Sequence, residues 1–167
     1  LLISKAGLMV LASETDLPIP SQPKKMADFF THYYQARVGQ IVSYGRQDWM
    51  APVASGSGCC KTMIVCPCTT GCLSAIANGT SDNLLERAAD VVIKEKGSLI
   101  LVVREMPLSA IHLEHMLKLS RLGVTIMPAC PGFYFKPQSV EDIVDFVVAR
   151  ILDQINIKHS LLPRWGE

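Results

Sequence analysis

Three short runs of apolar residues constrain the fold of this chain more than any other feature. They cover residues 63–66, 99–103 and 124–127, and stretches with the apolar spacing of helices lie between them. Strands that are apolar without alternation are buried on both faces, as in parallel sheets covered by helices. The sequence therefore predicts an α/β fold, with a parallel sheet as the middle of three layers and helices on both faces.

Further elements are expected around these strands. Residues 1–4 and 40–44 have the character of strands, and residues 45–60 form a long irregular segment rich in glycine and serine. Ser139 to Asp142 is similar to a capping box and predicts the start of the last helix. Other helices are expected over residues 5–15, 26–35 and 83–96.

Charge balance and length exclude several classes of protein. Sixteen basic and fifteen acidic side chains give a formal charge of +1, which gives no support for nucleic-acid binding. The longest stretch without charge, residues 62–81, contains Pro67, Gly71 and several hydroxyl groups, so it does not predict a membrane span. We expect residues 1–167 to form one domain, the size that this length predicts.

Six cysteines, five of them between residues 59 and 72, raise the question of disulfides or a metal. Pairings within so short a segment would be local, and the sequence contains no CxxC pair. We therefore expect free, mostly buried thiols in a reducing cytoplasm, with no metal bound. Cys66 and Cys68, two apart in a predicted strand, are expected on the same face.

Residues that follow the predicted strands are candidate site residues, because ligands of doubly wound sheets bind at the carboxyl ends of strands. Ser4, the turn Thr69–Cys72 and Tyr134 each follow a predicted strand. Small hydroxyl residues at a helix start can bind an anion or simply cap the helix. Arg104 and Glu105 follow a fourth strand directly, where charges would lie at the rim of a binding crevice.

Charged residues elsewhere allow more than one interpretation. Arg87 and Lys94 share one helix face, which is typical of a solvated stripe. Arg150, at the edge of the apolar face of the last helix, can pair with a carboxylate or bind a phosphate. Glu14 ends a predicted helix, an unfavourable place for a negative charge. From the residues alone, we predict an α/β domain that binds a phosphorylated small molecule.

Short motifs occur in a specific order along the chain: Asp48-Trp49-Met50-Ala51-Pro52, Cys66-Pro67-Cys68-Thr69-Thr70, Val103-Arg104-Glu105-Met106-Pro107, Pro131-Gly132-Phe133-Tyr134 and Pro163-Arg164-Trp165. Together they resemble the flavin prenyltransferases, the UbiX family. The resemblance implies a Rossmann-like, flavodoxin-like fold that binds FMN and assembles as a homododecamer. It implies transfer of a dimethylallyl group from dimethylallyl phosphate to reduced FMN. The prenylated FMN would serve a UbiD-like decarboxylase, for example in ubiquinone biosynthesis.

The resemblance also implies roles for individual residues. Those that match flavin contacts are Ser4, Thr69, Thr70, Gly71, Cys72 and Arg104. Those that match contacts to the prenyl phosphate, some across a subunit boundary, are Ser55, Gly56, Arg87, Lys94, Tyr134, Arg150 and the shielding Trp165. Glu14, Lys94 and Glu105 match catalytic positions. No metal is implied, because cations of the protein can stabilise the departing phosphate.

Two other functions remain alternatives on this fold. An FMN-dependent cysteine decarboxylase would carry an early catalytic histidine and a Pro-x-Met-Asn motif, and we find neither in the sequence. A non-catalytic flavin-binding or delivery protein would have little reason to keep Glu14, Lys94, Glu105, Tyr134 and Arg150 together. Because the family begins with a further strand, a glycine-rich phosphate loop and a helix, we expect the working protein to contain them as well.

Overall fold

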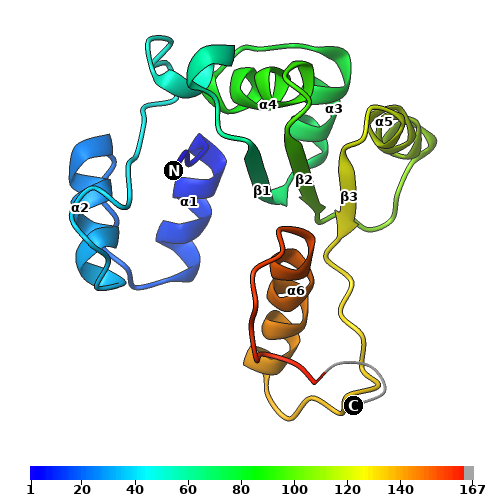
Figure 1. The fold of residues 1–167 in the computed structure, drawn as a ribbon. Coiled ribbons are helices and arrows are strands. Elements are labelled where there is room, and N and C mark those ends of the chain that lie inside the picture. Colours follow the sequence, from blue (N-terminus) through cyan, green and yellow to red (C-terminus); the bar gives the residue numbers. More distant parts are fainter. Residues whose placement is uncertain (164–167) are drawn as a thin grey trace.

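Parallel pairing of three strands organises the computed structural model, which describes residues 1–163. Strands β1 (Thr62–Cys68), β2 (Ser98–Val103) and β3 (Thr125–Pro128) form one sheet in that order (Figure 1). Both pairs are parallel, with Val65 opposite Leu101 and Leu101 opposite Ile126. The predicted parallel sheet is confirmed, and its strands are those that the apolar runs predicted.

Helices connect the strands and cover both faces of the sheet. Two helices lie between β1 and β2, one lies between β2 and β3, and one follows β3: α3 (Thr70–Asn78), α4 (Leu84–Lys94), α5 (Ala110–Arg121) and α6 (Val140–Gln154). Each begins at a residue whose side-chain oxygen accepts a backbone N–H of the first turn, namely Thr69, Asn83, Ser109 and Ser139. The predicted capping box at Ser139 and Asp142 is present.

The core lies on both sides of β2, whose side chains alternate between two clusters. One cluster joins β2 to α3, α4 and α5, and the other joins it to α6. The β2 residues of both clusters are at most 3% exposed: Leu99, Leu101 and Val103 in the first, Ile100 and Val102 in the second. Burial on both faces is what the unbroken apolar run of β2 predicted.

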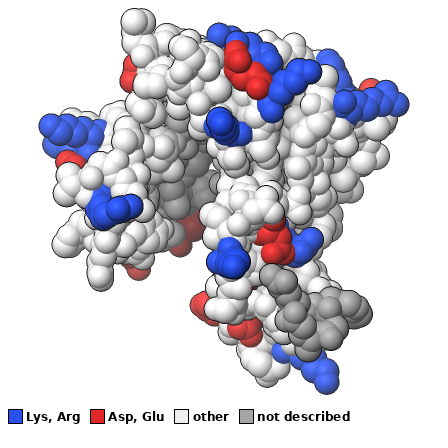
Figure 2. Space-filling view, viewed as in Figure 1, with Lys and Arg blue, Asp and Glu red and all other residues white. Residues whose placement is uncertain are grey.

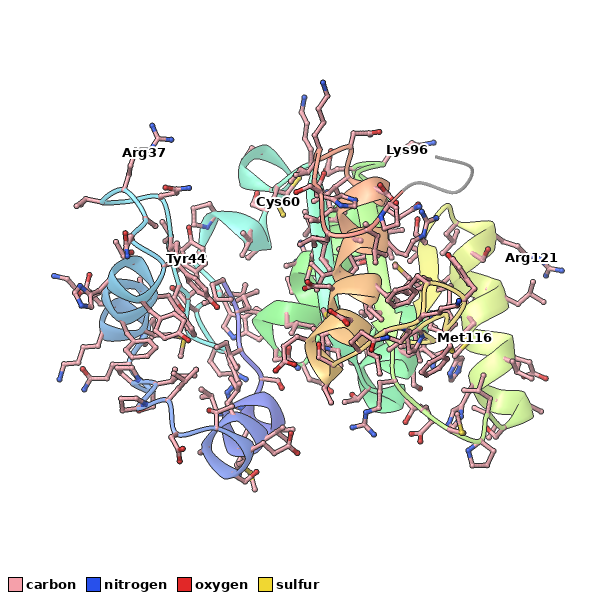
Figure 3. The ribbon with its side chains drawn as sticks, turned by 90° about the horizontal axis from the view of Figure 1, so that it is seen from below. Arg37, Tyr44, Cys60, Lys96, Met116 and Arg121 are labelled. Carbon is pink, nitrogen blue, oxygen red and sulfur yellow. The ribbon has the colours of Figure 1, made fainter. Side chains whose placement is uncertain are left out.

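Helix α5 shows how spacing along a helix separates core from solvent. Met116 and Leu119, three residues apart, are 8% and 0% exposed and belong to the core. Viewed from below, Met116 points toward the sheet and Arg121 points away from it (Figure 3). The helix therefore covers the sheet with one face and meets solvent with the other.

Residues 1–4 and 40–44, predicted as strands, are not strands of the sheet: residue 40 lies in a turn, and residues 1–4 and 42–44 have no regular secondary structure. Leu1 N donates to Val42 O at 2.5 Å, and Tyr44 N donates to Leu1 O at 3.1 Å. These bonds involve one residue of the first segment, which is too short a pairing for a ladder. The prediction of two additional strands is therefore wrong for the described chain.

A cavity of about 550 Å³ lies between β1 and the first four residues of the chain, and Tyr44 lines it as well. Most of its lining is apolar and includes Leu2, Ile3, Met63, Ile64 and Leu85. The surface is hollowed between the part that holds α1 (Lys5–Glu14) and α2 (Pro23–Tyr33) and the part that holds the sheet, with few charges on its visible walls (Figure 2). Such a lining suits a largely apolar ligand or chain segment.

The segment 45–60 is irregular, as predicted, except for two short 3-10 turns, η1 (Pro52–Ala54) and η2 (Gly56–Gly58). It crosses the top of the molecule and leads into β1 (Figure 1). None of the helices in the described part has the length and apolar character needed to cross a membrane.

The cysteines depart from two expectations. The pairing register shifts between Val65 and Cys68, so Cys68 is buried while Cys66 is exposed, and they do not share a face as predicted. Of the six thiols, all of them free, only Cys68 is buried. The expectation of mostly buried thiols is wrong for the single chain, because the others lie on loops, at the open edge of the sheet or at a helix start.

Candidate functional site

The carboxyl ends of the three strands meet at one edge of the sheet, as their parallel direction requires. Two hydrogen bonds join the residues that leave the strands: Arg104 N donates to Cys68 O at 3.4 Å, and Ala129 N donates to Val103 O at 2.9 Å. The predicted residues after β1 and β2 are therefore neighbours. This edge is the place where a doubly wound sheet binds its ligand.

The turn Thr69–Cys72 presents the start of α3 at this edge. Thr69 Oγ1 accepts a hydrogen bond from Cys72 N at 3.2 Å and caps the helix. A Cβ added at Gly71 would meet no atom closer than Thr69 Oγ1 at 4.0 Å, so the space above the turn is open. Backbone N–H groups of the first helical turn can therefore reach an anion or the polar edge of a ring.

Ser4 lies beside the carboxyl end of β1. Its Oγ accepts a hydrogen bond from Gly7 N at 2.9 Å and caps α1. Ser4 lines the 550 Å³ cavity together with Cys66 and Pro67, near the carboxyl end of β1. The structure therefore brings Ser4 and the β1 end together around one largely apolar cavity.

Two thiols beside this turn influence each other. Cys68 ends β1 with its side chain buried, and Cys72 lies in the first turn of α3. Hydrogen bonding between the two side chains lowers the pKa of Cys72 and, together with burial, raises the pKa of Cys68. The position of Cys72 at a helix N-terminus favours the thiolate as well. Cys72 is therefore the thiolate-forming member of the pair.

The two acidic candidates are exposed and lie on different elements. Glu14 is the last residue of α1, one helix length of about 15 Å from Ser4. Glu105 follows Arg104 directly after β2, and its Oε1 accepts a hydrogen bond from Met106 N at 3.1 Å. Both carboxylates are accessible to a ligand, and neither is held against another side chain by a contact within the described part.

A second cavity, of about 610 Å³, contains Tyr134 and Arg150. The ring of Tyr134 packs edge-on against Phe146 of α6, with centroids 5.9 Å apart. A Cβ at Gly132 would lie 2.7 Å from Tyr134 Cε1, so the chain can pass the ring only with glycine here. Arg150 Nη1 donates to Asp153 Oδ2 at 2.5 Å. The structure therefore brings these two predicted phosphate contacts into one cavity.

The remaining predicted phosphate contacts form a separate group where segment 52–58 packs on α4. Arg87 Nε donates to Ala54 O at 3.1 Å, and Arg87 Nη1 contacts Asp90 Oδ2 at 2.9 Å. Lys94 forms an ion pair with Glu95. A Cβ at Gly56 would overlap Glu95 and lie 3.0 Å from Lys94 Nζ, so glycine allows the loop to approach this pair.

These two groups lie on helices that cover opposite faces of the sheet. The group on α4 lies at the top of the molecule, whereas α6 lies at the bottom (Figure 1). Within one chain, Lys94 and Arg150 therefore belong to helices on opposite sides of the sheet. The expectation that some of these residues act across a subunit boundary stays a prediction. Trp165, the predicted shielding residue, lies outside the described residues.

The sequence did not single out Asp153 and His159, which contact the Arg150 cavity. Asp153 lies three residues after Arg150, a spacing that places the two on one helix face. That spacing could have indicated from the sequence that Asp153 contacts Arg150. His159 lies in an irregular segment, where no periodicity indicates which way a side chain points.

Comparison with known proteins gives close similarity over nearly the whole chain. The Flavoprotein family model matches residues 1–152. Flavin prenyltransferase UbiX of Pseudomonas aeruginosa is 59% identical over 166 residues, which are 99% of this chain and 79% of that protein. The protein of the same description from Halalkalibacterium halodurans is 49% identical over 167 residues, 100% of this chain and 79% of that protein.

Solved structures agree in fold. The crystal structure of AnUbiX in complex with FMN and dimethylallyl pyrophosphate matches with a TM-score of 0.84 at 37% identity, over 99% of this chain and 81% of that one. A dodecameric FMN-dependent UbiX-like decarboxylase from Escherichia coli O157:H7 matches with a TM-score of 0.83 at 42% identity, over 99% of this chain and 82% of that one. The Rossmann-like flavoprotein fold expected from the sequence is thereby confirmed.

We predict that the low pKa of Cys72 depends on Cys68. In Cys68→Ala the hydrogen bond is lost, so the pKa of Cys72 should rise and its alkylation at pH values below that pKa should slow, because the thiolate is the reactive form. The measurement is the pH dependence of iodoacetamide alkylation at Cys72, followed by peptide mass spectrometry. Cys68→Ser keeps a donor and is the control. An unmoved midpoint in Cys68→Ala contradicts the interpretation.

Proposed function

As a member of the UbiX family of flavin prenyltransferases, this chain is a flavin prenyltransferase, and we propose that it joins the dimethylallyl group of dimethylallyl phosphate to reduced FMN. The 59% identity to the Pseudomonas aeruginosa enzyme over 99% of the chain is the observation that carries this proposal. The neighbour described in complex with FMN and dimethylallyl pyrophosphate supports the two classes of substrate.

The edge of the sheet fits a flavin mononucleotide. We assign its contacts to Ser4, the turn Thr69–Cys72 and Arg104, which lie at the carboxyl ends of residues 1–4, β1 and β2. The open space above Gly71 and the largely apolar cavity beside Ser4 are what a flat ring with polar edges requires. Reduced FMN would supply the nucleophilic ring atoms that accept the prenyl group.

Cations and a phenol would bind the donor phosphate. Breaking the allylic carbon–oxygen bond leaves a phosphate anion, which Arg150 and Tyr134 can stabilise from the α6 side. Lys94, Arg87 and the loop residues Ser55 and Gly56 would complete the site from a neighbouring subunit. These protein cations can neutralise the departing phosphate, so the proposal includes no metal.

Glu14 and Glu105 are proposed to handle protons. Both carboxylates are exposed, Glu105 directly after β2 at the edge of the sheet and Glu14 at the far end of α1 from Ser4. One of them would hold or move the proton of the departing phosphate or of the flavin during the reaction. Lys94 joins them as a proposed catalytic residue through its charge.

The product would pass to a decarboxylase of the UbiD type. We further propose that residues 1–167 act as one flavoprotein domain, in the reducing environment of the cytoplasm that six free thiols favour. The decarboxylase that receives the product would belong to ubiquinone synthesis or to the metabolism of aromatic acids.

Mass analysis of the flavin tests the proposed reaction. Reduced FMN and dimethylallyl phosphate are incubated anaerobically with the protein, and the flavin is then extracted. A flavin heavier by one prenyl unit is expected, and samples without protein or without the donor serve as controls. Recovery of unmodified FMN from protein that binds FMN would contradict the proposal.

Arg150→Ala should weaken donor binding and leave FMN binding intact. A hydrogen bond to a charged group is worth about 1.5–3 kcal/mol, so the apparent donor affinity should fall about tenfold or more. Donor titrations of the initial rate measure the change, and FMN affinity is measured separately by fluorescence quenching. An unchanged donor titration would remove Arg150 from the phosphate site.

Glu14→Gln and Glu105→Gln separate proton transfer from binding. Each change keeps the shape of the side chain but removes the ionisable group, so the variant that replaces the proton-handling residue should slow the chemical step by about 10²–10⁴-fold. Single-turnover rates at several pH values, with FMN affinity as control, measure the effect. Full activity of both variants at every pH would show that neither carboxylate handles the proton.

Assembly should be necessary for activity, because α4, which carries Lys94, and α6, which carries Arg150, cover opposite faces of the sheet in one chain. The dodecameric Escherichia coli neighbour supports a homododecamer here. If equal amounts of Lys94→Ala and Arg150→Ala subunits are refolded together, about a quarter of the composite sites should regain both residues. Activity well above that of either variant alone is expected. Mixed particles with no such gain would place both residues in one subunit.

A further inference from the structure

Asp153 contacts two residues through its two carboxylate oxygens. Oδ2 accepts a hydrogen bond from Arg150 Nη1 at 2.5 Å, one turn earlier on α6. Oδ1 lies 3.1 Å from Nε2 of His159, in the segment that follows the helix. All three residues line the 610 Å³ cavity that also contains Tyr134. Asp153 therefore bridges the arginine and the segment beyond α6.

The backbone shows which nitrogen of His159 carries the proton. Leu161 N donates a hydrogen bond to His159 Nδ1 at 3.3 Å, so Nδ1 is an acceptor without a proton. The proton of the neutral ring is therefore on Nε2, which donates to Asp153 Oδ1. Both carboxylate oxygens accept a hydrogen bond, and the carboxylate is held in one orientation.

The end of α6 explains why His159 lies beside Asp153. Asn156 adopts the left-handed conformation with a φ of 57°, and Ile157 N donates to Leu152 O at 3.0 Å. This is the Schellman pattern, which ends a helix and reverses the chain. The side chain of His159 is only 14% exposed, compared with 43% for Asp153 and 51% for Arg150. The histidine is thus a packed anchor for an otherwise exposed ion pair.

We propose that Asp153 and His159 are positioning residues that orient Arg150 toward the phosphate of the prenyl donor. This inference rests on the proposed role of Arg150. A guanidinium has five N–H donors, and the contact with Asp153 uses one from Nη1, so others can bind a phosphate. An exposed ion pair by itself contributes little to stability. A carboxylate anchored by His159, however, already restricts the side chain of Arg150 before the donor binds, so less conformational entropy is lost on binding.

The direction in which Asp153→Asn changes the donor KM shows whether Asp153 positions Arg150 or only lies near the phosphate. If the carboxylate orients Arg150, the amide holds the guanidinium less firmly, because it has no charge and a single acceptor oxygen for the two donors Arg150 and His159. The donor KM should then rise about fivefold or more with kcat nearly unchanged. A carboxylate that only lies near the phosphate repels it, so its removal would lower the donor KM. Asp145→Asn removes the same charge from α6 about 12 Å away and should leave the KM unchanged.

A double-mutant cycle tests whether Asp153 acts through Arg150. In the Arg150→Ala background, Asp153→Asn should have no further effect on the donor KM. If Arg150→Ala itself leaves the KM unchanged, the proposed function of Arg150 fails. If Arg150→Ala raises the KM and Asp153→Asn does not, only the positioning role is overturned.

His159 provides a second test that does not depend on the carboxylate variant. His159→Gln keeps a side-chain N–H for Asp153 Oδ1 and should retain a donor KM near that of the unmodified protein. His159→Leu keeps an apolar side chain in the packed position but removes the donor, and should raise the KM as Asp153→Asn does. Equal KM values for the two variants, with FMN affinity unchanged in both, would overturn the inference.

Discussion

Parallel pairing of β2 with a neighbour on each side is the constraint on which the rest of the structure depends. It buries β2 on both faces and requires helical connections, which cover the sheet with α3, α4 and α5 on one face and α6 on the other. It also places the ends of all three strands at one edge. The hydrogen bonds Arg104 N to Cys68 O and Ala129 N to Val103 O hold the departing segments together there. The proposed flavin site is thus a consequence of strand direction.

Much of this fold could be predicted because burial leaves a local signal in the sequence. The apolar runs and helical spacings predicted the three strands and the helices α1, α2 and α4, since each pattern reflects which faces are buried, and the polar residues Thr69 and Ser139 indicated the starts of α3 and α6. Residues 1–4 and 40–44 carry the same apolar signal, but a strand needs a partner along its length, and they share hydrogen bonds at Leu1 alone. Pairing is a property of two segments, so one segment's composition could not show it.

Part of the candidate site could likewise be predicted from the sequence, and part of it needed the structure. Ser4, the turn Thr69–Cys72 and Arg104 were predictable from their places after apolar segments, because topology brings such places together. The assignment of Tyr134 and Arg150 to one phosphate depended on family resemblance, and their shared cavity needed the three-dimensional structure. His159 lies beside Asp153 only because the chain reverses after Asn156. No spacing rule describes a contact made across an irregular segment.

The three cations assigned to the donor phosphate each have a carboxylate partner, in the pairs Arg87–Asp90, Lys94–Glu95 and Arg150–Asp153. Their side chains are between 35% and 51% exposed, so each pair contributes at most about 1 kcal/mol. A hydrogen bond between a cation and a phosphate is worth about 1.5–3 kcal/mol, so the donor phosphate can compete with these carboxylates for the N–H groups of the cations.

The carboxylates on α4 and on α6 differ in how firmly they are held. Asp90 and Glu95 have no second anchor among the described contacts and can swing away, whereas Asp153 is also held by His159. The α4 side of a composite site would therefore rearrange when the phosphate arrives. The α6 side would meet it with an arginine already in place.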